Sequence, residues 1–202
     1  NLDGSAVEEI VSSSAGLNHP LAIALHPATG KIYFTDTGIQ YIKRANLDGS
    51  NLESLLTFDI GYFPNGVAVD QTNNKLYWAR DTIFRADLDT SNSQAIIFGT
   101  HLGSLYVDEV NAKLYWRDVT NDKILRGNLD GSNTEDFVTA DADYSGGMAA
   151  DAANSKFYWC DWVGSNIHHV GLDGTNKQNR FSPALVTPEA AAIDADARKI
   201  FF

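Results

Sequence analysis

The 202-residue sequence has a single cysteine, Cys160, which excludes an internal disulfide and leaves the redox compartment undetermined. It also has few basic side chains: 15 lysines and arginines face 26 aspartates and glutamates, for a formal net charge of −11. This acidic field repels nucleic acid and anionic membrane surfaces and attracts basic partners. No apolar run approaches the ~20 residues of a membrane span, and no signal peptide stands at the start. We therefore expect a basic protein partner, no nucleic-acid partner and no direct membrane insertion.

Catalytic patterns are missing as well. The sequence has no Gly-rich phosphate loop and no zinc-ligand spacing. His168 and His169 are adjacent, so on a strand they would point to opposite faces and could not share a metal ion. Cys160 lies in an aromatic stretch, which is typical of a buried inert thiol. We expect no catalytic residues, no metal and no cofactor, and hence no enzyme.

What the sequence does contain is repetition at a fixed period. The phrase NLDGS stands at 1–5, 46–50 and 128–132, with the near-copies DLDTS at 87–91 and GLDGT at 171–175. A second phrase joins a lysine to a hydrophobic and aromatic pair, and its leading aromatics are 44, 38, 43 and 43 residues apart. Its copies are KIYFTD at 31–36, KLYWAR at 75–80, KLYWRD at 113–118, KFYWCD at 156–161 and KIFF at 199–202.

Each repeat contains four short segments rich in β-branched and aromatic residues and bounded by turn residues, and no segment forms a convincing amphipathic helix. Four strands at a period near 40 residues indicate an all-β chain, a β-propeller of four-stranded antiparallel blades. We expect about five blades in one domain over residues 1–202. The units are 20–57, 64–98, 102–138, 145–182 and 188–202, with 1–11 closing the ring or belonging to the preceding blade.

The phrase NLDGS is expected to form the turn between the third and fourth strands. Asp-Gly supplies residues that tolerate the positive φ of tight hairpin turns. A calcium loop would need a longer series of ligands ending in Glu. The acidic appearance of the phrase is therefore interpreted as turn chemistry.

The alternation of small and large side chains also suits a propeller, whose sheets converge on a central axis. The innermost strands carry small residues, such as Ala22, Ala24, Ala68 and Ala149, whereas Tyr106 is large and is expected to protrude into the channel. One strand outward, where there is more room, rings that each bury 150–250 Å² should form the core. These rings are Tyr33, Phe34, Tyr77, Trp78, Tyr115, Trp116, Tyr158, Trp159, Phe201 and Phe202.

Recurring charges suggest pairs across the hairpins. Asp36 precedes Arg44 by eight residues, as Asp118 precedes Arg126. We expect these carboxylates to meet the arginines on the adjacent strand, since a partly buried carboxylate needs such a partner. His169 takes the arginine place opposite Asp161. In the second unit Arg80 and Arg85 occupy the two places and the hairpin is three residues shorter, so local rearrangement is expected, with Asp81 substituting.

The motifs YFTD (33–36), YWRD (115–118), YWCDW (158–162) and PNGVAVD (64–70), together with IKRANLDGS (42–50) and ILRGNLDGS (124–132), resemble the YWTD repeat, the class B repeat of low-density lipoprotein receptors. The resemblance covers the whole chain. It implies six-bladed propellers on secreted or cell-surface proteins, which bind other proteins through the face carrying the strand 2–3 and strand 4–1 loops and are not enzymes. We therefore expect an extracellular or cell-surface protein, part of a longer chain, in a six-bladed ring or, as the alternative, a five-bladed one.

The candidate binding residues lie on the rim that the resemblance implies. Exposed aromatics there would be good anchors, because they bury much area with few rotors. Trp162 is either such an anchor or a cap on the neighbouring blade. The rim residues are Asn18, His19, Tyr62, Phe63, His101, Asp118, Asn121, Asp143, Tyr144 and Trp162.

Two other functions are kept as alternatives. The propeller could be a structural building block of an extracellular assembly or filament, which requires large lateral contacts. It could also be a lactonase-type propeller with a metal in its channel. For that site the inner strands offer chiefly Glu189, with Asn65 as a second ligand.

Overall fold

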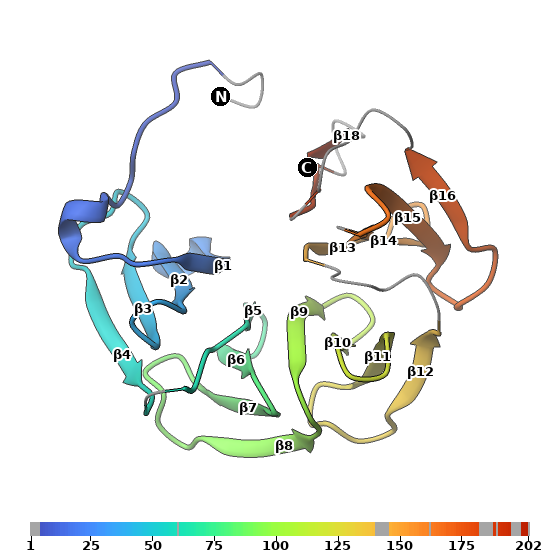
Figure 1. Ribbon diagram of the computed structural model, residues 1–202, viewed down its shortest axis with the longest axis horizontal. Coiled ribbons are helices and arrows are strands. Elements are labelled where there is room, and N and C mark those ends of the chain that lie inside the picture. The colour runs from blue at the N-terminus through green and yellow to red at the C-terminus, as the bar shows by residue number, and fades with distance from the viewer. Residues whose placement is uncertain are drawn as a thin grey trace.

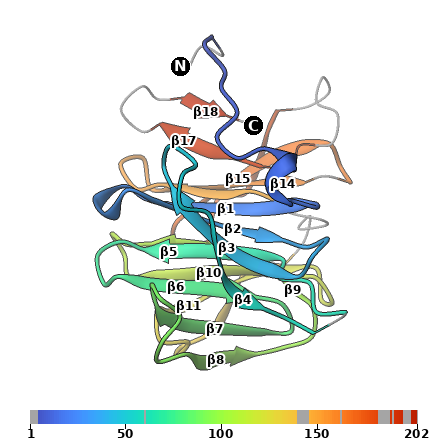
Figure 2. The ribbon, with the colours of Figure 1, turned by 90° about the vertical axis from the view of Figure 1, so that its left-hand side faces the viewer.

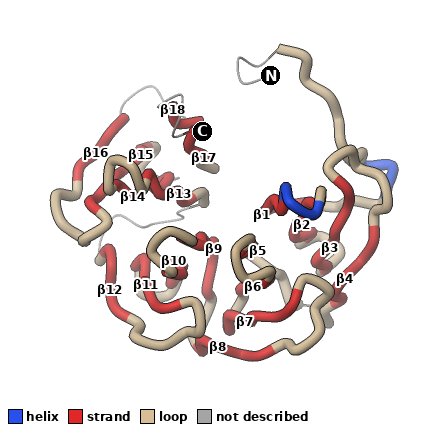
Figure 3. Tube along the Cα trace, turned by 180° about the vertical axis from the view of Figure 1, so that it is seen from behind, coloured by secondary structure: helices blue, strands red, loops and turns tan. Residues whose placement is uncertain are grey.

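The computed structural model describes residues 5–59, 61–139, 146–161, 163–181, 188, 190–194 and 199–201. These residues form antiparallel sheets arranged as blades around an axis, with the first strand of each blade innermost and the fourth outermost (Figure 1). Seen from behind, the same order repeats from blade to blade (Figure 3). The chain is thus an all-β propeller.

Four sheets are complete four-stranded blades. Blade 1 contains β1 (Pro20–His26), β2 (Lys31–Asp36), β3 (Tyr41–Asn46) and β4 (Glu53–Thr57). Blade 2 contains β5 (Gly66–Asp70), β6 (Lys75–Ala79), β7 (Thr82–Asp87) and β8 (Gln94–Phe98). Blade 3 contains β9 (Leu102–Asp108), β10 (Lys113–Asp118), β11 (Lys123–Asn128) and β12 (Glu135–Val138). Blade 4 contains β13 (Met148–Asp151), β14 (Lys156–Asp161), β15 (Asn166–Gly171) and β16 (Gln178–Phe181).

A further two-stranded sheet pairs β17 (Ala192–Asp194) with β18 (Lys199–Phe201). It continues the arc beside blade 4, where β17 contacts β13. Two short 3₁₀ helices, η1 (Ser13–Ala15) and η2 (Pro27–Thr29), flank β1. The described residues therefore form four whole blades and the two-stranded start of another, against an expectation of about five, and the number of blades in the ring remains a prediction.

The second strand of each blade carries the rings that fill the space between blades. In blade 3, Tyr115 and Trp116 are each 1% exposed, and in blade 4, Trp159 is 0% exposed. The ring of Tyr115 stacks on that of Phe157 from the next blade, with centroids 4.5 Å apart. Because the two phenyl planes belong to neighbouring sheets, this contact joins blade to blade. The same strands bury Tyr33, Phe34, Tyr77, Trp78 and Tyr158.

The inner strands carry small side chains, as the limited space near the axis requires. The expectation that Tyr106 protrudes into the channel was wrong. Its ring is half-buried between blades 3 and 4, with centroids 6.0 Å from Phe157 and 6.3 Å from Tyr115. This burial raises the pKa of the Tyr106 phenol. The ring packs beside Tyr115 because the two residues are directly paired across β9 and β10. Tyr106 thus packs against the core between blades 3 and 4 and does not project into the channel.

The residue that ends each inner strand organises the turn after it. Asp70, Asp108 and Asp151 each accept hydrogen bonds from the backbone N–H and the side-chain amide of an asparagine three residues later, at 2.7–3.0 Å. His26 takes the same place in blade 1 and accepts a bond from the Thr29 N–H at 3.3 Å, the turn contact expected of it. These bonds fix the entry into the aromatic strands of the four complete blades.

The repeated NLDGS phrase forms the connection between the third and fourth strands. In blade 1, Asp48 Oδ1 accepts bonds from the N–H and hydroxyl of Ser50, at 3.0 and 2.6 Å. These bonds lower the pKa of Asp48. Gly49 and Gly131 have φ of 81° and 85°, which favours glycine. A Cβ on Gly131 would also collide with the Ile96 carbonyl of the preceding blade. Ile10 takes the same position against Gly49 that Ile96 takes against Gly131.

The expected pairs of Asp36 with Arg44 and of Asp118 with Arg126 do not form, and this expectation was wrong. The hairpin register sets Asp36 opposite Tyr41 and places Arg44 opposite Tyr33, three positions further along the strands. Blade 3 has the same register, with Asp118 opposite Lys123. Each arginine instead pairs with a glutamate on the fourth strand, Arg44 with Glu53 at 2.7 Å.

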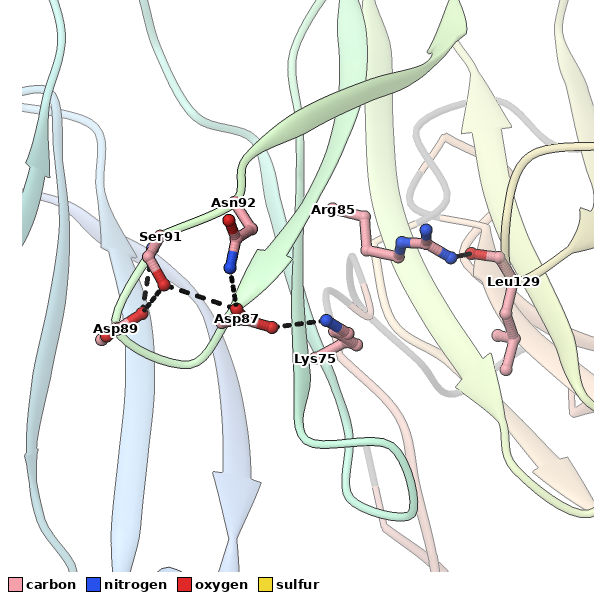
Figure 4. A network of polar contacts seen from close by, with 7 residues as sticks. All are labelled: Lys75, Arg85, Asp87, Asp89, Ser91, Asn92 and Leu129. Carbon is pink, nitrogen blue, oxygen red and sulfur yellow. Dashed lines mark hydrogen bonds and ion pairs between the residues drawn. The ribbon is translucent and has the colours of Figure 1, made fainter.

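These arginines also join the blades. Arg44, Arg85 and Arg126 donate to the carbonyls of Leu88, Leu129 and Leu172 at 3.1, 3.3 and 2.6 Å. Each acceptor is the leucine of the NLDGS-type turn in the next blade. Figure 4 shows Arg85 reaching Leu129, beside the turn of its own blade, in which Asp87 binds Lys75, Ser91 and Asn92. The repeated phrase is therefore both a hairpin turn and the acceptor of an inter-blade hydrogen bond.

Tyr77 adds a second donor to the same acceptor. Its hydroxyl donates to the Leu129 carbonyl at 3.0 Å. Burial raises the Tyr77 pKa to about 12. The phenol therefore keeps its proton, and remains a donor, at physiological pH.

Trp116→Ala tests the core. Because the side chain is 1% exposed, its removal should lower the free energy of unfolding by about 3–5 kcal/mol, as measured by urea denaturation. Val110→Ala is the control, since Val110 is 77% exposed and its truncation should change stability by less than about 0.5 kcal/mol. Equal stability of the two variants would contradict the assigned packing.

Arg126→Met tests the inter-blade hydrogen bond. It keeps much of the aliphatic side chain but leaves the Leu172 carbonyl and Glu135 without their donor, so we expect a loss of about 1–3 kcal/mol in unfolding free energy. Lys123→Met is the control, because it breaks an ion pair with Asp136 within one blade that is worth under about 1 kcal/mol. A loss no larger than that of the control would show that the inter-blade bond does not stabilise the fold.

Cys160 should be unreactive in the folded protein. The side chain is fully buried in β14, and its Sγ lies 3.2 Å from the Ala190 carbonyl, to which it donates. Burial raises the thiol pKa to about 11, so little thiolate, the reactive form, exists at neutral pH. A chromogenic disulfide reagent should label Cys160 only after urea is added. Rapid labelling without urea would contradict this placement.

Candidate functional site

The loops of the expected rim lie at one end of the propeller. The strands run across the thickness of the disc, so their connections gather at its two ends (Figure 2). In each complete blade the start of the first strand, the hairpin between the second and third, and the end of the fourth share one end, because successive strands are antiparallel. This rim end is therefore built from several blades.

The hairpins at the rim end differ in length. Those of blades 1, 3 and 4 have four connecting residues, 37–40, 119–122 and 162–165. The hairpin of blade 2 has only two, Arg80 and Asp81, between β6 and β7. The rearrangement expected for this unit takes a specific form: Asp81 pairs with Arg80, with Nη1 and Oδ2 3.4 Å apart. Arg85 does not take part and keeps its hydrogen bond to the Leu129 carbonyl.

Arg80 holds the loop that enters blade 2. Its guanidinium carbon lies 3.6 Å from the centroid of the Tyr62 ring, and its Nη2 donates to the Gly61 carbonyl at 2.7 Å. The Tyr62 N–H donates to the Asp59 carbonyl at 2.9 Å, and the Asn65 N–H to the Ala79 carbonyl at 2.9 Å. The arginine thus fixes Tyr62 by a cation–π contact and a hydrogen bond to the residue before it.

Asp81 holds the loop that leaves blade 2. Its Oδ1 accepts a bond from the His101 N–H at 3.1 Å, and its backbone carbonyl accepts from the Gly99 N–H at 2.9 Å. The Leu102 N–H donates to the Arg80 carbonyl. One two-residue hairpin therefore fastens two loops that are some forty residues apart in sequence.

The aromatic residues on these loops are exposed. Tyr62 and Phe63 are 49% and 46% exposed, and His101 is also exposed. Sequence reasoning missed Phe98, which is 80% exposed at the end of β8 and is paired with Thr82 immediately after the hairpin. The signal was available: Phe98 is an aromatic at the rim end of an outer strand, where packing does not require one.

The rim residues of blades 1 and 3 form separate groups. His19 Nδ1 lies 2.8 Å from the Asn18 side-chain oxygen, and the Asn18 N–H donates to Asp36 at 2.7 Å. Asp118 accepts bonds from the N–H and side-chain amide of Asn121 at 3.0 and 2.8 Å. The blade 1 bonds tie the segment before β1 to the end of β2, and the blade 3 bonds lie within the β10–β11 hairpin. Both His19 and Asn121 are exposed.

Three rim residues of the sequence prediction, Asp143, Tyr144 and Trp162, lie outside the described residues. In blade 4 the hairpin carboxylate has a histidine partner, but not the one expected. Asp161 Oδ2 lies 3.2 Å from Nε2 of His168, whereas His169 is paired with Tyr158. The register again decides this, because Asp161 aligns with Asn166 and leaves His168 on its own side of the sheet.

The lactonase-type site finds little support in the described residues. Asn65 donates its side-chain amide to the Leu102 carbonyl at 3.2 Å, and Glu189 lies outside the described part of the chain. Across the described ranges, no three histidine, cysteine or carboxylate side chains gather where one metal ion could bind them.

Two hollows lie on the faces of blades 1 and 4. An apolar cleft of about 370 Å³ on blade 1 is lined by residues including Ile10, Leu21, Ile23 and Phe34. A polar pocket of about 480 Å³ on blade 4 includes His169, in the place that Arg126 holds in blade 3. Both belong to blade faces of the kind that neighbouring blades cover elsewhere in the molecule. The described part of the chain contains no helix whose length and hydropathy would suit a membrane span.

Comparison with known proteins agrees with this architecture. Residues 30–71 match the family model described as low-density lipoprotein receptor repeat class B. The Protein cueball of Drosophila sechellia is 31% identical over 126 residues, covering 58% of this chain and 19% of that protein. The human low-density lipoprotein receptor-related protein 5-like protein is 40% identical over 88 residues, covering 42% of this chain and 34% of that protein. The chain thus matches between a fifth and a third of the length of these relatives.

Two solved structures share the fold. A chain of the nidogen/laminin complex superposes with a TM-score of 0.77 at 23% identity, over 85% of this chain and 67% of that one. A gluconolactonase from Xanthomonas campestris gives 0.73 at 18% identity, over 89% of this chain and 68% of that one. Identities this low show the fold alone. Together with the matched repeat, they show that this chain is a β-propeller that contains a low-density lipoprotein receptor class B, or YWTD, repeat at residues 30–71.

Proposed function

We propose that this propeller is an extracellular, non-enzymatic protein-binding module whose rim end recognises a protein partner. The observation that carries the proposal is the exposure of Tyr62 and Phe63 on a loop that Arg80 holds in place. Ordered aromatic side chains bury large areas at little entropic cost, and such residues dominate binding energy at interfaces. The acidic chain, with a net charge of −11, favours a partner of basic character.

The relatives support this class of function. The matched repeat is named for a receptor, and one structural neighbour was solved in a complex of nidogen with laminin. Both point to proteins that act outside the cell or at its surface by binding other proteins. The proposal extends that role to this chain as one module of a larger protein.

The gluconolactonase neighbour keeps an enzymatic alternative in view. A lactonase-type mechanism needs several oxygen ligands converging on a metal in the channel. Hydrolysis of gluconolactone that depends on added divalent metal and is lost in Asn65→Ala would favour the enzyme. The structural building block is the other alternative, and concentration-dependent self-association without any rim ligand would favour it.

The binding role is tested with the double variant Tyr62→Ala/Phe63→Ala. Laminin and a panel of extracellular proteins are immobilised, and binding of the folded chain is measured by surface plasmon resonance. We expect the variant to bind its partner at least about tenfold more weakly, because truncating interface aromatics removes more than about 1.4 kcal/mol.

Val110→Ala is the matched control, since it also truncates an exposed apolar residue and lies in the turn between β9 and β10, at the opposite end of the disc. Its affinity should equal that of the unmodified chain. If the unmodified chain and the Tyr62→Ala/Phe63→Ala variant bind every member of the panel equally, Tyr62 and Phe63 are not anchors. The rim proposal itself fails if His19→Ala and Asn121→Ala also leave the affinity unchanged.

A further inference from the structure

We propose that the Arg80–Asp81 hairpin gathers the two loops beside it into one recognition patch, and that this patch binds a basic segment of a protein partner carrying an apolar anchor. The patch consists of Asp59, Tyr62, Phe63, Phe98 and His101. The inference deepens the proposed binding function and rests on it. Arg80 and Asp81 are positioning residues, because they act through the side chains that they hold.

The first argument is that blade 2 departs from the repeat at this point. In blades 1, 3 and 4 the residue three positions after the leading tyrosine of the aromatic strand is a carboxylate that bonds within its own blade: Asp36 to Asn18, Asp118 to Asn121 and Asp161 to Gly164. In blade 2 that residue is Arg80, whose long side chain reaches the Gly61 carbonyl and the Tyr62 ring on the loop that leads in from blade 1. The substitution turns a local hairpin contact into a contact between loops.

The second argument is preorganisation. Tyr62 is 49% exposed, although Arg80 lies over its ring. The ring is therefore fixed by the protein and still available to a ligand. On the other side of the hairpin, the bond from the His101 N–H to Asp81 sets the loop that follows Phe98. A patch whose aromatic groups are already ordered loses little conformational entropy on binding.

The third argument, charge, selects the class of partner. Of the five described patch residues and the two hairpin residues that hold them, Arg80 alone is an arginine or lysine, and it already contacts Asp81, the Gly61 carbonyl and the Tyr62 ring. Asp59 is exposed beside Tyr62, and the chain as a whole is acidic. An acidic segment would therefore find no available cation here, whereas a lysine or arginine could approach Asp59 and the open aromatic faces.

The apolar anchor follows from the exposed ring area. Tyr62, Phe63 and Phe98 expose roughly half or more of their surface, and a group of exposed apolar side chains rimmed by polar residues is typical of an interaction site. A leucine or isoleucine next to the basic residue would cover these rings, while the basic group stays at the solvent-exposed edge of the patch near Asp59. A short segment that alternates basic and aliphatic residues meets both requirements.

The test uses two capped peptides as probes, Gly-Lys-Leu-Lys-Gly and Gly-Glu-Leu-Glu-Gly, titrated into the whole chain and followed by NMR. We expect saturable shifts at Tyr62, Phe63 and His101 with the lysine peptide and none with the glutamate peptide. Tyr62→Ala, Phe63→Ala and Phe98→Ala should each weaken lysine-peptide binding about three- to tenfold. Val110→Ala and Glu8→Gln, which alter an exposed apolar residue and an exposed carboxylate elsewhere, should leave it within about twofold.

The positioning role needs its own variants. Arg80→Lys keeps the charge but loses the planar stack and the fixed donors, so it should weaken the peptide about threefold and broaden the Tyr62 ring signals, with an unchanged melting temperature. Asp81→Asn keeps the shape and an acceptor oxygen while removing the charge opposite Arg80. Asp81→Asn should weaken lysine-peptide binding by a similar factor, and this difference from the unmodified chain should disappear at high salt.

The outcomes separate the two proposals. Equal binding of the glutamate peptide, or no saturable binding of the lysine peptide, overturns the basic, apolar-anchored patch. Weakening by His19→Ala and Asn121→Ala, with none from the blade 2 variants, also overturns it but leaves the rim as the binding face. If laminin or another panel protein binds and no rim variant changes that affinity, the proposed function itself fails.

Discussion

The structure depends on one constraint: a four-stranded sheet must bury both faces, and it does so only against its neighbours around an axis. Space is least near the axis and increases outward, so small residues such as Ala68 and Ala149 stand on inner strands, and rings such as Trp116 and Trp159 stand one strand out. Burying such rings supplies most of the favourable free energy. Every blade is therefore part of the core of the next.

Packing alone does not fix how far one blade slides along another, and the arginine to leucine hydrogen bonds supply that register. Arg44, Arg85 and Arg126 each reach a turn carbonyl of the following blade. A bond to a charged donor is stronger and more directional than dispersion between rings. The turn must hold its carbonyl in one place, and the Asp and Ser side chains of NLDGS, together with a glycine at positive φ, achieve this.

The core fills the middle of the blades, and the arginine to leucine bonds lie toward the end opposite the rim. The loops at the rim end can therefore differ between blades without disturbing either. Blade 2 differs from the other blades at this end, because its hairpin is two residues long and has Arg80 where the other complete blades have aspartate. Arg80 and Asp81 together then join loops from two sides, and Tyr62, Phe63 and Phe98 stay exposed. The proposed binding patch thus lies at the hairpin where blade 2 departs from the repeat.

The sequence by itself determined the strands, their order in a blade and the aromatic core, since these follow from local alternation and from a spacing that recurs around Tyr33, Tyr77, Tyr115 and Tyr158. The sequence also predicted that Tyr62 and His101 lie at the rim. The predictions that Asp36 pairs with Arg44 and that Tyr106 enters the channel were wrong, and Phe98 was not predicted as a rim residue. Only the tertiary structure decided those points. Hairpin register places Arg44 opposite Tyr33, and the partner of Arg44, Leu88, comes from another blade 44 residues away. Contacts between segments so far apart depend on the relative position of whole blades, which no local pattern encodes.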